Sequence, residues 1–198
     1  MQTIVQIETK FGVIRVVLDE DAAPITATNF LAYVDEGLYD GGMFHRTVRL
    51  DNQSNKNLKR ETIGKGIDPK ADRDQLPNDE VAIEVIQGGV NRDREDELGD
   101  PIPLERTSET GLSHVDGTIS MARLTPDSAV SDFFICINDQ PSLDYGGKRN
   151  PDGQGFAAFG HVIEGMDVVR TIHAQPADGQ RLDPPVTINR IARESDER

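Results

Sequence analysis

Apolar and polar positions alternate near both ends of the chain. Residues 3–9 alternate with a period of two, and a run rich in β-branched residues, 13–18, follows a turn at Phe11-Gly12. Alternation with this period is typical of a half-buried strand. These two runs therefore predict an antiparallel hairpin, and a further alternating run at residues 186–191 predicts a strand near the C-terminus.

Two other segments have helical spacing. Pro24 and Gly37 stand where a helix favours its first turn and its end. Between them an apolar stripe follows the spacing i, i+3, i+4 and i+7 and consists of Ala27, Phe30, Leu31 and Val34. Near the C-terminus, apolar residues recur at a spacing of three, at Met166, Val169 and Ile172. We therefore predict one helix between Pro24 and Gly37 and a second over residues 162–173.

The middle of the chain holds short apolar runs at 81–87, 117–122 and 133–137, each bounded by Gly, Asp or Pro. Such runs predict the short strands of an all-β sheet. One predicted helix follows the second strand, and the other precedes the last strand. This order favours a closed or nearly closed sheet with helices at its ends.

Residues 50–80 do not fit this pattern, because they include very few large apolar residues. Their composition predicts an exposed loop, and a loop of this length usually signals function or an elaboration of one family. The apolar runs on both sides of the loop have to share one core. We therefore predict a single domain over residues 1–198 with an inserted loop at about 50–80.

Composition and charge exclude several classes of function. The 35 acidic residues outnumber the 21 basic ones, and the net charge of -14 disfavours binding to nucleic acid or to an anionic membrane. No run approaches the ~18 apolar residues that span a bilayer. The start of the chain lacks the basic and apolar regions of a signal peptide. We expect a cytoplasmic protein, or a periplasmic one if a leader was removed.

The usual catalytic motifs do not occur in the sequence. No serine lies in a G-x-S-x-G elbow, and the four histidines form no i, i+2 or i, i+4 pair. The lone cysteine, Cys136, lies within an apolar run, where free cysteine is most often a small buried hydrophobe. A single cysteine also excludes an internal disulfide and a cysteine-rich zinc site. We therefore expect neither a metal nor a cofactor.

Five blocks of sequence nevertheless form a specific series: Tyr39–Arg46, Val85–Gly89, Asp116–Arg123, Ser131–Ile135 and Phe159–Val169. Asn29-Phe30, in the first predicted helix, precedes them. In order and spacing these blocks resemble the cyclophilin family of peptidyl-prolyl isomerases. The resemblance runs from about Ile4 to Ile191 and leaves out most of the 50–80 loop. The run Ser-Met-Ala-Arg and an acidic residue before two phenylalanines look most like bacterial members.

The resemblance implies a fold and an activity. The fold is an eight-stranded antiparallel closed barrel capped by two α-helices. The activity is rotation about the peptide bond before proline in unfolded or flexible protein segments, which assists protein folding. Amide resonance sets a barrier of about 20 kcal/mol to this rotation. A catalyst has to bind the twisted amide better than either planar form, and this chemistry requires no nucleophile, metal or cofactor.

The resemblance also implies roles for individual residues. Arg46 corresponds to the catalytic arginine, whose fork of donors can reach the substrate carbonyl and the prolyl nitrogen. Gln87 corresponds to the glutamine that binds the substrate backbone and orients the arginine. The other substrate-binding positions are the walls of the proline pocket, Phe134, Leu143 and Phe156, the edge along the substrate backbone, Ala122 and Arg123, and Asp132. Because successive strand residues face opposite sides, Phe133 should face the core.

Four positions depart from the best-known eukaryotic pattern. Glu84 and Val85 stand where the pocket has a phenylalanine and a methionine, and Asp132 replaces a glutamine. The lost phenylalanine predicts reduced activity, a shifted substrate preference or an aromatic side chain supplied from elsewhere. Ser142 replaces the tryptophan that binds cyclosporin, so we expect cyclosporin binding to be weak.

Two alternatives to an active isomerase stay open at this point. The first is a non-catalytic module that binds proline-containing peptides, since the altered pocket can retain affinity without rate. The second is a scaffold whose 50–80 loop is the interaction surface. For the isomerase we expect proline-containing polypeptides as partners and a monomeric state. The acidic net charge also predicts an acidic rim around one arginine, which would favour neutral or basic substrates.

Overall fold

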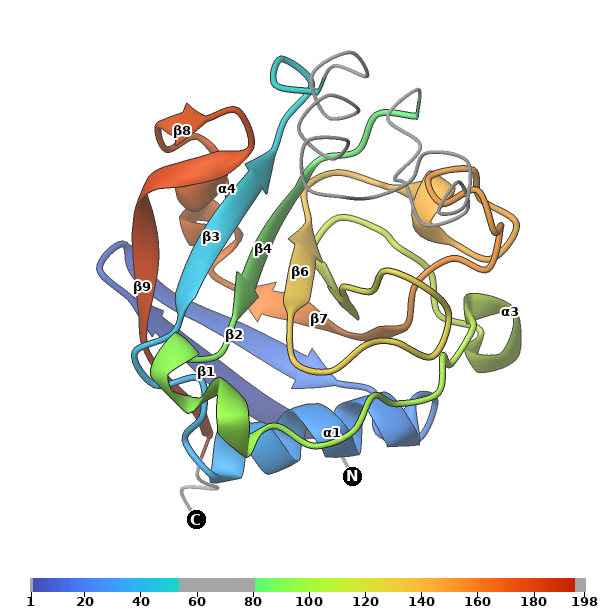
Figure 1. Cartoon of the computed structure of the whole chain (residues 1–198), viewed down its shortest axis with the longest axis horizontal. Helices are drawn as coiled ribbons and strands as arrows, with labels where there is room; N and C mark the ends of the chain where they lie inside the picture. Colours follow the sequence, from blue (N-terminus) through green and yellow to red (C-terminus); the bar gives the residue numbers. More distant parts are fainter. Residues whose placement is uncertain (1, 54–80, 195–198) are drawn as a thin grey trace.

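Eight antiparallel strands close into a barrel in the computed structural model, which describes residues 2–53 and 81–194 (Figure 1). The strands follow the order β1-β2-β7-β5-β6-β4-β3-β9, and β9 also pairs with β1. Their bounds are β1 Thr3–Thr9, β2 Gly12–Leu18, β3 Met43–Val48, β4 Val85–Gly89, β5 Thr118–Met121, β6 Phe133–Cys136, β7 Ala158–Glu164 and β9 Arg181–Arg193. The two-residue strand β8, Ala177–Asp178, pairs with β9 outside this ring. The predicted eight-stranded closed barrel is therefore confirmed.

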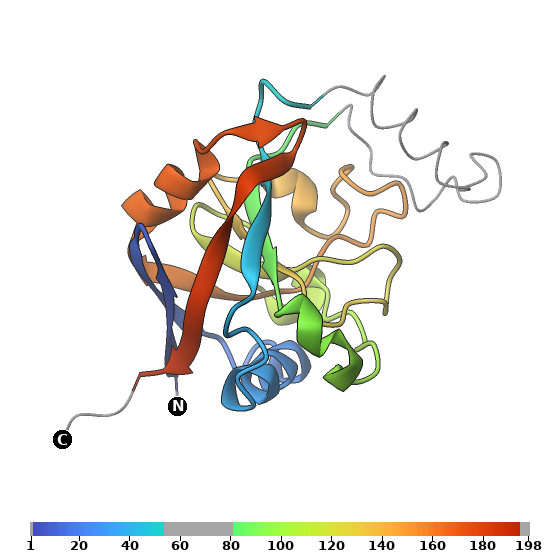
Figure 2. The same cartoon turned by 60° about the vertical axis from the view of Figure 1, so that its left-hand side comes forward.

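Two helices lie at opposite ends of the barrel, α1 (Pro24–Asp35) and α4 (Met166–His173) (Figure 2). Shorter helical segments are α3 (Thr107–Thr110) and the 3-10 helices η1 (Arg92–Glu97) and η2 (Pro141–Leu143). Among the described residues, no helix is both long enough and apolar enough to cross a membrane.

Two of the predicted boundaries were wrong. The second helix begins at Met166 and not at residue 162, because residues 162–164 continue β7. Gly165 makes the sharp change of direction with φ 93°, and a Cβ at this position would lie 2.4 Å from the Val13 carbonyl oxygen. The run at 81–87 also becomes a strand only from Val85.

Two apolar clusters lie on opposite faces of the same strands. The first, here called the main core, fills the barrel and includes Phe30, Phe44, Phe133 and Phe159, all fully buried. The second, here called the pocket cluster, consists of Val48, Ile83, Val85, Phe134, Cys136, Leu143 and Phe156. Because side chains alternate along a strand, β6 sends Phe133 into the main core and Phe134 into the pocket cluster. The predicted division between these two phenylalanines is confirmed.

Most of the predicted 50–80 loop lies outside the described residues, so its exposed character stays a prediction. The described chain on either side of it belongs to one sheet, because β3 and β4 pair directly. Their register sets Arg46 opposite Gln87 and Val48 opposite Val85. This pairing places two of the predicted site residues, Arg46 and Gln87, on neighbouring strands.

Candidate active site

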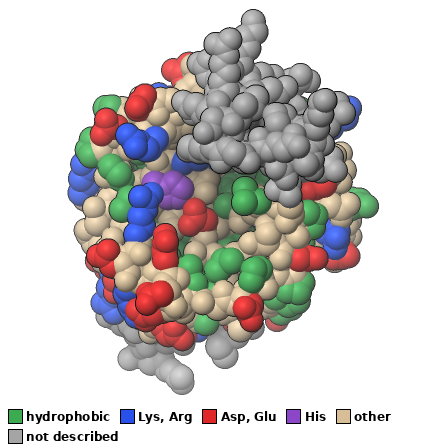
Figure 3. All heavy atoms as spheres, in the orientation of Figure 1, with side chains coloured by type: hydrophobic (Ala, Val, Ile, Leu, Met, Phe, Trp, Pro, Cys, Tyr) green, Lys and Arg blue, Asp and Glu red, His purple; other side chains and the backbone are tan. Residues whose placement is uncertain are grey.

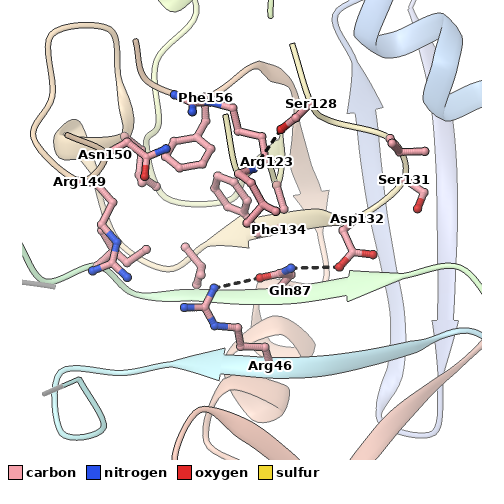
Figure 4. Close-up of a pocket in the computed structure, with 16 residues that line it drawn as sticks. Arg46, Gln87, Arg123, Ser128, Ser131, Asp132, Phe134, Arg149, Asn150 and Phe156 are labelled. Atoms are coloured by element: carbon pink, nitrogen blue, oxygen red, sulfur yellow. Dashed lines mark hydrogen bonds between the residues drawn. The ribbon is translucent and has the colours of Figure 1, made fainter. Parts of the chain in front are cut away.

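A cavity of about 380 Å³ opens over the pocket cluster. All eight site residues predicted from the sequence line it: Arg46, Gln87, Ala122, Arg123, Asp132, Phe134, Leu143 and Phe156. Figure 4 shows that they come from separate parts of the chain, with Arg46 on β3, Gln87 on β4 and Phe134 on β6. The fold therefore brings the predicted residues together, while the role of each in binding or catalysis stays a prediction.

The apolar wall of the pocket is formed by Phe134, Leu143 and Phe156, each of which is buried. The rings of Phe134 and Phe156 meet edge to face, with centroids 5.5 Å apart and an interplanar angle of 88°. This is a favourable geometry for aromatic pairs. The wall is therefore a rigid apolar surface of the kind that a proline ring can contact.

The polar side of the pocket is a chain of hydrogen bonds that starts at Arg46. Its Nη1 donates to Gln87 Oε1 over 3.0 Å, and Gln87 Nε2 donates to Asp132 Oδ2 over 3.0 Å (Figure 4). His45 Nε2 lies 3.0 Å from the same Asp132 oxygen. The Asp132 carboxylate fits over β4 because residue 89 is glycine, where a Cβ would lie 2.1 Å from Asp132 Oδ1.

A residue that the sequence analysis missed holds Arg46 from its other side. Gln180 Oε1 accepts from Arg46 Nε over 3.0 Å and from Arg46 Nη2 over 2.6 Å. Gln180 follows Gly179 in the turn between β8 and β9. It lies 134 positions from Arg46 in the sequence and belongs to none of the five matched blocks, so no local signal marks it.

Glu84 stands where the best-known eukaryotic pattern has a phenylalanine, and a neighbouring residue forms this part of the cavity wall instead. Glu84 does not line the cavity; its Oε2 accepts from Asn138 Nδ2 over 2.9 Å. Ile83 lines the cavity instead, alongside Val85 and Gln87. These three residues are two apart, so they face the same side of an extended chain. The apolar wall is thus extended by an aliphatic side chain, and the alternation of residues 83–87 was the signal that could have revealed it.

Among the residues that the structure describes, the lining of the cavity does not show the predicted acidic rim. The charged residues in its described lining are Arg46, Arg123, Arg149 and Asp132. Acidic side chains gather instead on the lower left of the face in Figure 3, over η1, whose sequence is RDREDE. The net charge of the whole chain did not predict the charge of the described lining, because the acidic residues of η1 lie outside it.

Arg123 lines the cavity, but its guanidinium braces the protein itself. It pairs with Asp152 through an Nη1–Oδ2 distance of 2.8 Å, its Nε donates to the Gly155 carbonyl over 2.9 Å, and it lies over the Phe156 ring. Its side chain is only 1% exposed. Arg123 thereby fixes one aromatic wall, and a direct bond from its guanidinium to a substrate would require these contacts to break.

The segment between η2 and β7 adds two lining residues that no motif predicted, Arg149 and Asn150. Arg149 Nη1 donates to the Val81 carbonyl over 2.9 Å, so it ties this segment to the chain that leads into β4. Ser142, where the best-known eukaryotic pattern has a tryptophan, is not among the described residues that line the cavity.

A buried serine and a buried histidine, together with a half-buried aspartate, lie behind Phe134. His114 Nδ1 lies 2.7 Å from Asp144 Oδ1, and His114 Nε2 lies 2.9 Å from Ser120 Oγ. Ser120 is fully buried, so this trio offers no accessible nucleophile. The His114 ring stacks on Phe134 with centroids 6.0 Å apart, and the trio therefore supports the apolar wall.

Neither the lone cysteine nor a cluster of metal-ligating side chains supplies further chemistry in the described part of the chain. Burial raises the pKa of the Cys136 thiol well above its ordinary value, so this cysteine stays protonated. No group of three or more His, Cys, Asp or Glu side chains in residues 2–53 and 81–194 is arranged to hold a metal ion.

Comparison with known proteins identifies the family to which this chain belongs. The family described as cyclophilin type peptidyl-prolyl cis-trans isomerase/CLD matches residues 4–193. The chain belongs to the cyclophilin family. It is 33% identical over 175 residues to a peptidyl-prolyl cis-trans isomerase of Acinetobacter baylyi, covering 88% of this chain and 73% of the relative. It is 32% identical over 171 residues to peptidyl-prolyl cis-trans isomerase A of Dickeya dadantii, covering 86% of this chain and 70% of the relative.

The fold comparison agrees with the family assignment. A crystal structure of a Cryptosporidium parvum cyclophilin type peptidyl-prolyl cis-trans isomerase, determined in the presence of the dipeptide Ala-Pro, matches with a TM-score of 0.68 and 21% identity. The match covers 98% of this chain and 99% of the other. This cyclophilin is accordingly an isomerase of the bond before proline.

Proposed function

We propose that this cyclophilin isomerises X-Pro bonds in flexible protein segments with Arg46 as the catalytic residue. The proline ring would contact Phe134, Leu143 and Phe156, and the substrate backbone would run along Ala122 and Arg123. The observation that carries the proposal is the position of Arg46, which lines the same cavity as the apolar wall and is held by Gln87.

The chemistry follows from what happens to an amide when it twists. A planar amide shares the nitrogen lone pair with the carbonyl, and rotation by a quarter turn removes this resonance. The prolyl nitrogen then becomes a hydrogen-bond acceptor that it was not in the planar form. A guanidinium donor beside the nitrogen therefore binds the twisted amide more strongly than either planar isomer, which lowers the barrier.

The other groups would hold the substrate while the bond turns. The apolar wall grips the ring of the proline, so that one side of the bond stays fixed. Gln87 is already anchored to Asp132 at its Nε2, which leaves its oxygen directed at Arg46. Asp132 is therefore proposed to act on substrate through Gln87 and by its own exposed edge in the pocket.

The test of this proposal is Arg46→Ala in a protease-coupled assay on a proline-containing tetrapeptide. We expect kcat/KM to fall at least about 100-fold, since the variant lacks the donor for the twisted amide. Arg92→Ala is the matched control, because Arg92 is an exposed arginine of η1 outside the cavity. Equal rates for the wild type and Arg46→Ala, with circular dichroism unchanged, would overturn the role of Arg46.

The same variants separate catalysis from binding alone. NMR exchange spectra of a proline peptide report interconversion of its cis and trans resonances. A binding module would shift these resonances on titration without any exchange above the uncatalysed rate. For the isomerase we expect exchange with the wild type, and its loss with Arg46→Ala while the binding shifts persist.

Three finer expectations belong to the same proposal. Weak cyclosporin binding rests on Ser142, which replaces the expected tryptophan. We also propose that the protein is a monomer and that it is cytoplasmic. Analytical ultracentrifugation and cell fractionation measure the last two directly.

A further inference from the structure

The guanidinium of Arg46 is held between two glutamine side chains, here called the amide clamp, Gln87 and Gln180. Gln87 Oε1 accepts from Nη1 at one edge of the guanidinium. Gln180 Oε1 accepts from both Nε and Nη2 at the opposite edge, over 3.0 and 2.6 Å. Two amide oxygens on opposite edges restrict rotation of the planar guanidinium more than either does alone.

Each amide of the clamp is itself oriented by a group that can only accept hydrogen bonds. Gln87 Nε2 donates to the carboxylate of Asp132 over 3.0 Å, and Gln180 Nε2 donates to the carbonyl oxygen of Asn52 over 3.4 Å. An amide has one donor end and one acceptor end. When an acceptor takes the NH₂ end, the oxygen has to point the other way, here toward Arg46.

The backbone around Gln180 is also tied to the strand that carries Arg46. Thr47 N donates to the Gln180 carbonyl oxygen over 2.9 Å. Asn52 Nδ2 donates to the carbonyls of Thr47 and Gly179 over 2.9 and 3.1 Å. The turn between β8 and β9 is therefore fastened to the end of β3, so Gln180 keeps its place beside the guanidinium in the absence of substrate.

We propose that Gln180 is a positioning residue for isomerisation, acting through Arg46; this inference rests on the proposed catalytic role of Arg46. A neutral amide orients the guanidinium through hydrogen bonds without itself adding a negative charge beside it. Preorganisation of this kind lowers the barrier without strengthening substrate binding, because Gln180 does not line the cavity. Removal of the Gln180 amide is therefore expected to lower kcat and to leave KM unchanged.

The test compares Gln180→Met, which keeps the length of the side chain and removes the acceptor, with Gln180→Glu, which keeps an acceptor. We expect kcat of Gln180→Met to fall about tenfold or more, since the variant loses both hydrogen bonds from the charged guanidinium, with KM within about twofold of the wild type. The kcat of Gln180→Glu should lie between those of the wild type and Gln180→Met. Gln175→Met is the matched control, since Gln175 is a half-buried glutamine nearby whose side chain donates to the Thr171 carbonyl; its activity should equal that of the wild type.

Two further readouts separate positioning from a general loss of structure. The NMR signal of the Arg46 Nε–H group should show slow solvent exchange in the wild type and fast exchange in Gln180→Met, with the melting temperature unchanged. In the Arg46→Ala background, Gln180→Met should cause no further loss, because a residue that acts through Arg46 has nothing left to position.

The possible failures are distinguishable. If Arg46→Ala is fully active, the proposed site itself is wrong. If Arg46→Ala is inactive while Gln180→Met keeps the wild-type kcat, the site stands and the role of Gln180 is overturned. A rise in KM at constant kcat, or a Gln180→Glu variant slower than Gln180→Met, would likewise overturn positioning by the acceptor oxygen.

Discussion

The main core and the pocket cluster are built from the same strands but are packed for different purposes. In the main core, Phe133 meets Phe30, Tyr39 and Phe44 at centroid distances of 5.6–5.7 Å, and its side chain is fully buried. In the pocket cluster, its neighbour Phe134 contacts Phe156 and His114 and borders a cavity. One strand thus serves stability on one face and binding on the other, because its side chains alternate.

The largest expected effect tests this division directly. Phe133→Ala should lower the free energy of unfolding by about 3–5 kcal/mol, since it leaves a void in a closed core. Phe134→Ala should lose less stability, because its ring already borders a cavity, and should lower kcat/KM about tenfold or more through loss of the apolar wall. Urea denaturation and the protease-coupled assay measure the two quantities.

If the two alanine variants lose the same stability and Phe134→Ala keeps full activity, the pocket cluster is merely an outlying part of the core. Thermal melts in the presence of a proline peptide provide the control. Peptide should stabilise the wild type and a folded main-core variant, and it should stabilise Phe134→Ala much less.

An effect of intermediate size tests which residues at the edge of the pocket cluster contact the substrate. Ile83 lines the cavity, whereas Glu84 bonds to Asn138 outside it. Ile83→Ala should raise KM about threefold to tenfold through lost apolar contact, while Glu84→Ala should change KM less than about twofold. A larger effect at Glu84 than at Ile83 would mean that the substrate reaches the opposite face of this segment.

The smallest expected effect is a pH dependence of the free energy of unfolding that arises from Asp152, the partner of Arg123. Burial raises the pKa of Asp152, but the hydrogen bonds from Arg123 and from the Gln154 backbone N–H outweigh it, so the pKa is lowered overall. A carboxyl whose folded pKa is depressed contributes stability that is present above its unfolded pKa of about 3.9 and is lost as pH falls through the folded value.

The measurement compares the free energy of unfolding of the wild type and Asp152→Asn across pH. The wild type should be the more stable at pH 6, and the difference should shrink as the pH falls below about 4. A pH-independent difference would show that the Asp152 contact is not ionic. The buried apolar side chains of the main core form no ion pair of this kind. The contribution of the main core to the free energy of unfolding should therefore depend less on pH.

Much of the site followed from sequence because its parts lie within short motifs. Arg46, Gln87 and Phe134 sit in blocks whose order and spacing identify the family, and the family match then carried their neighbours Leu143 and Phe156. What failed was the inference from net charge. A total of -14 says nothing about where the charges lie, and the described lining of the cavity carries three arginines and one aspartate.

The sequence by itself determined six of the eight barrel strands, the two capping helices and the opposite destinations of Phe133 and Phe134, whereas β3 and β7 were not marked by its periodicity. These depend on periods of two and of 3.6 residues, which are local properties of the chain. Only the tertiary structure decided that Ile83 lines the cavity while Glu84 does not, that Arg123 pairs with Asp152, and that Gln180 accepts hydrogen bonds from Arg46. Those contacts join residues far apart in sequence, and they exist only once closure of the barrel has brought β3 beside β9 and the loops around the cavity.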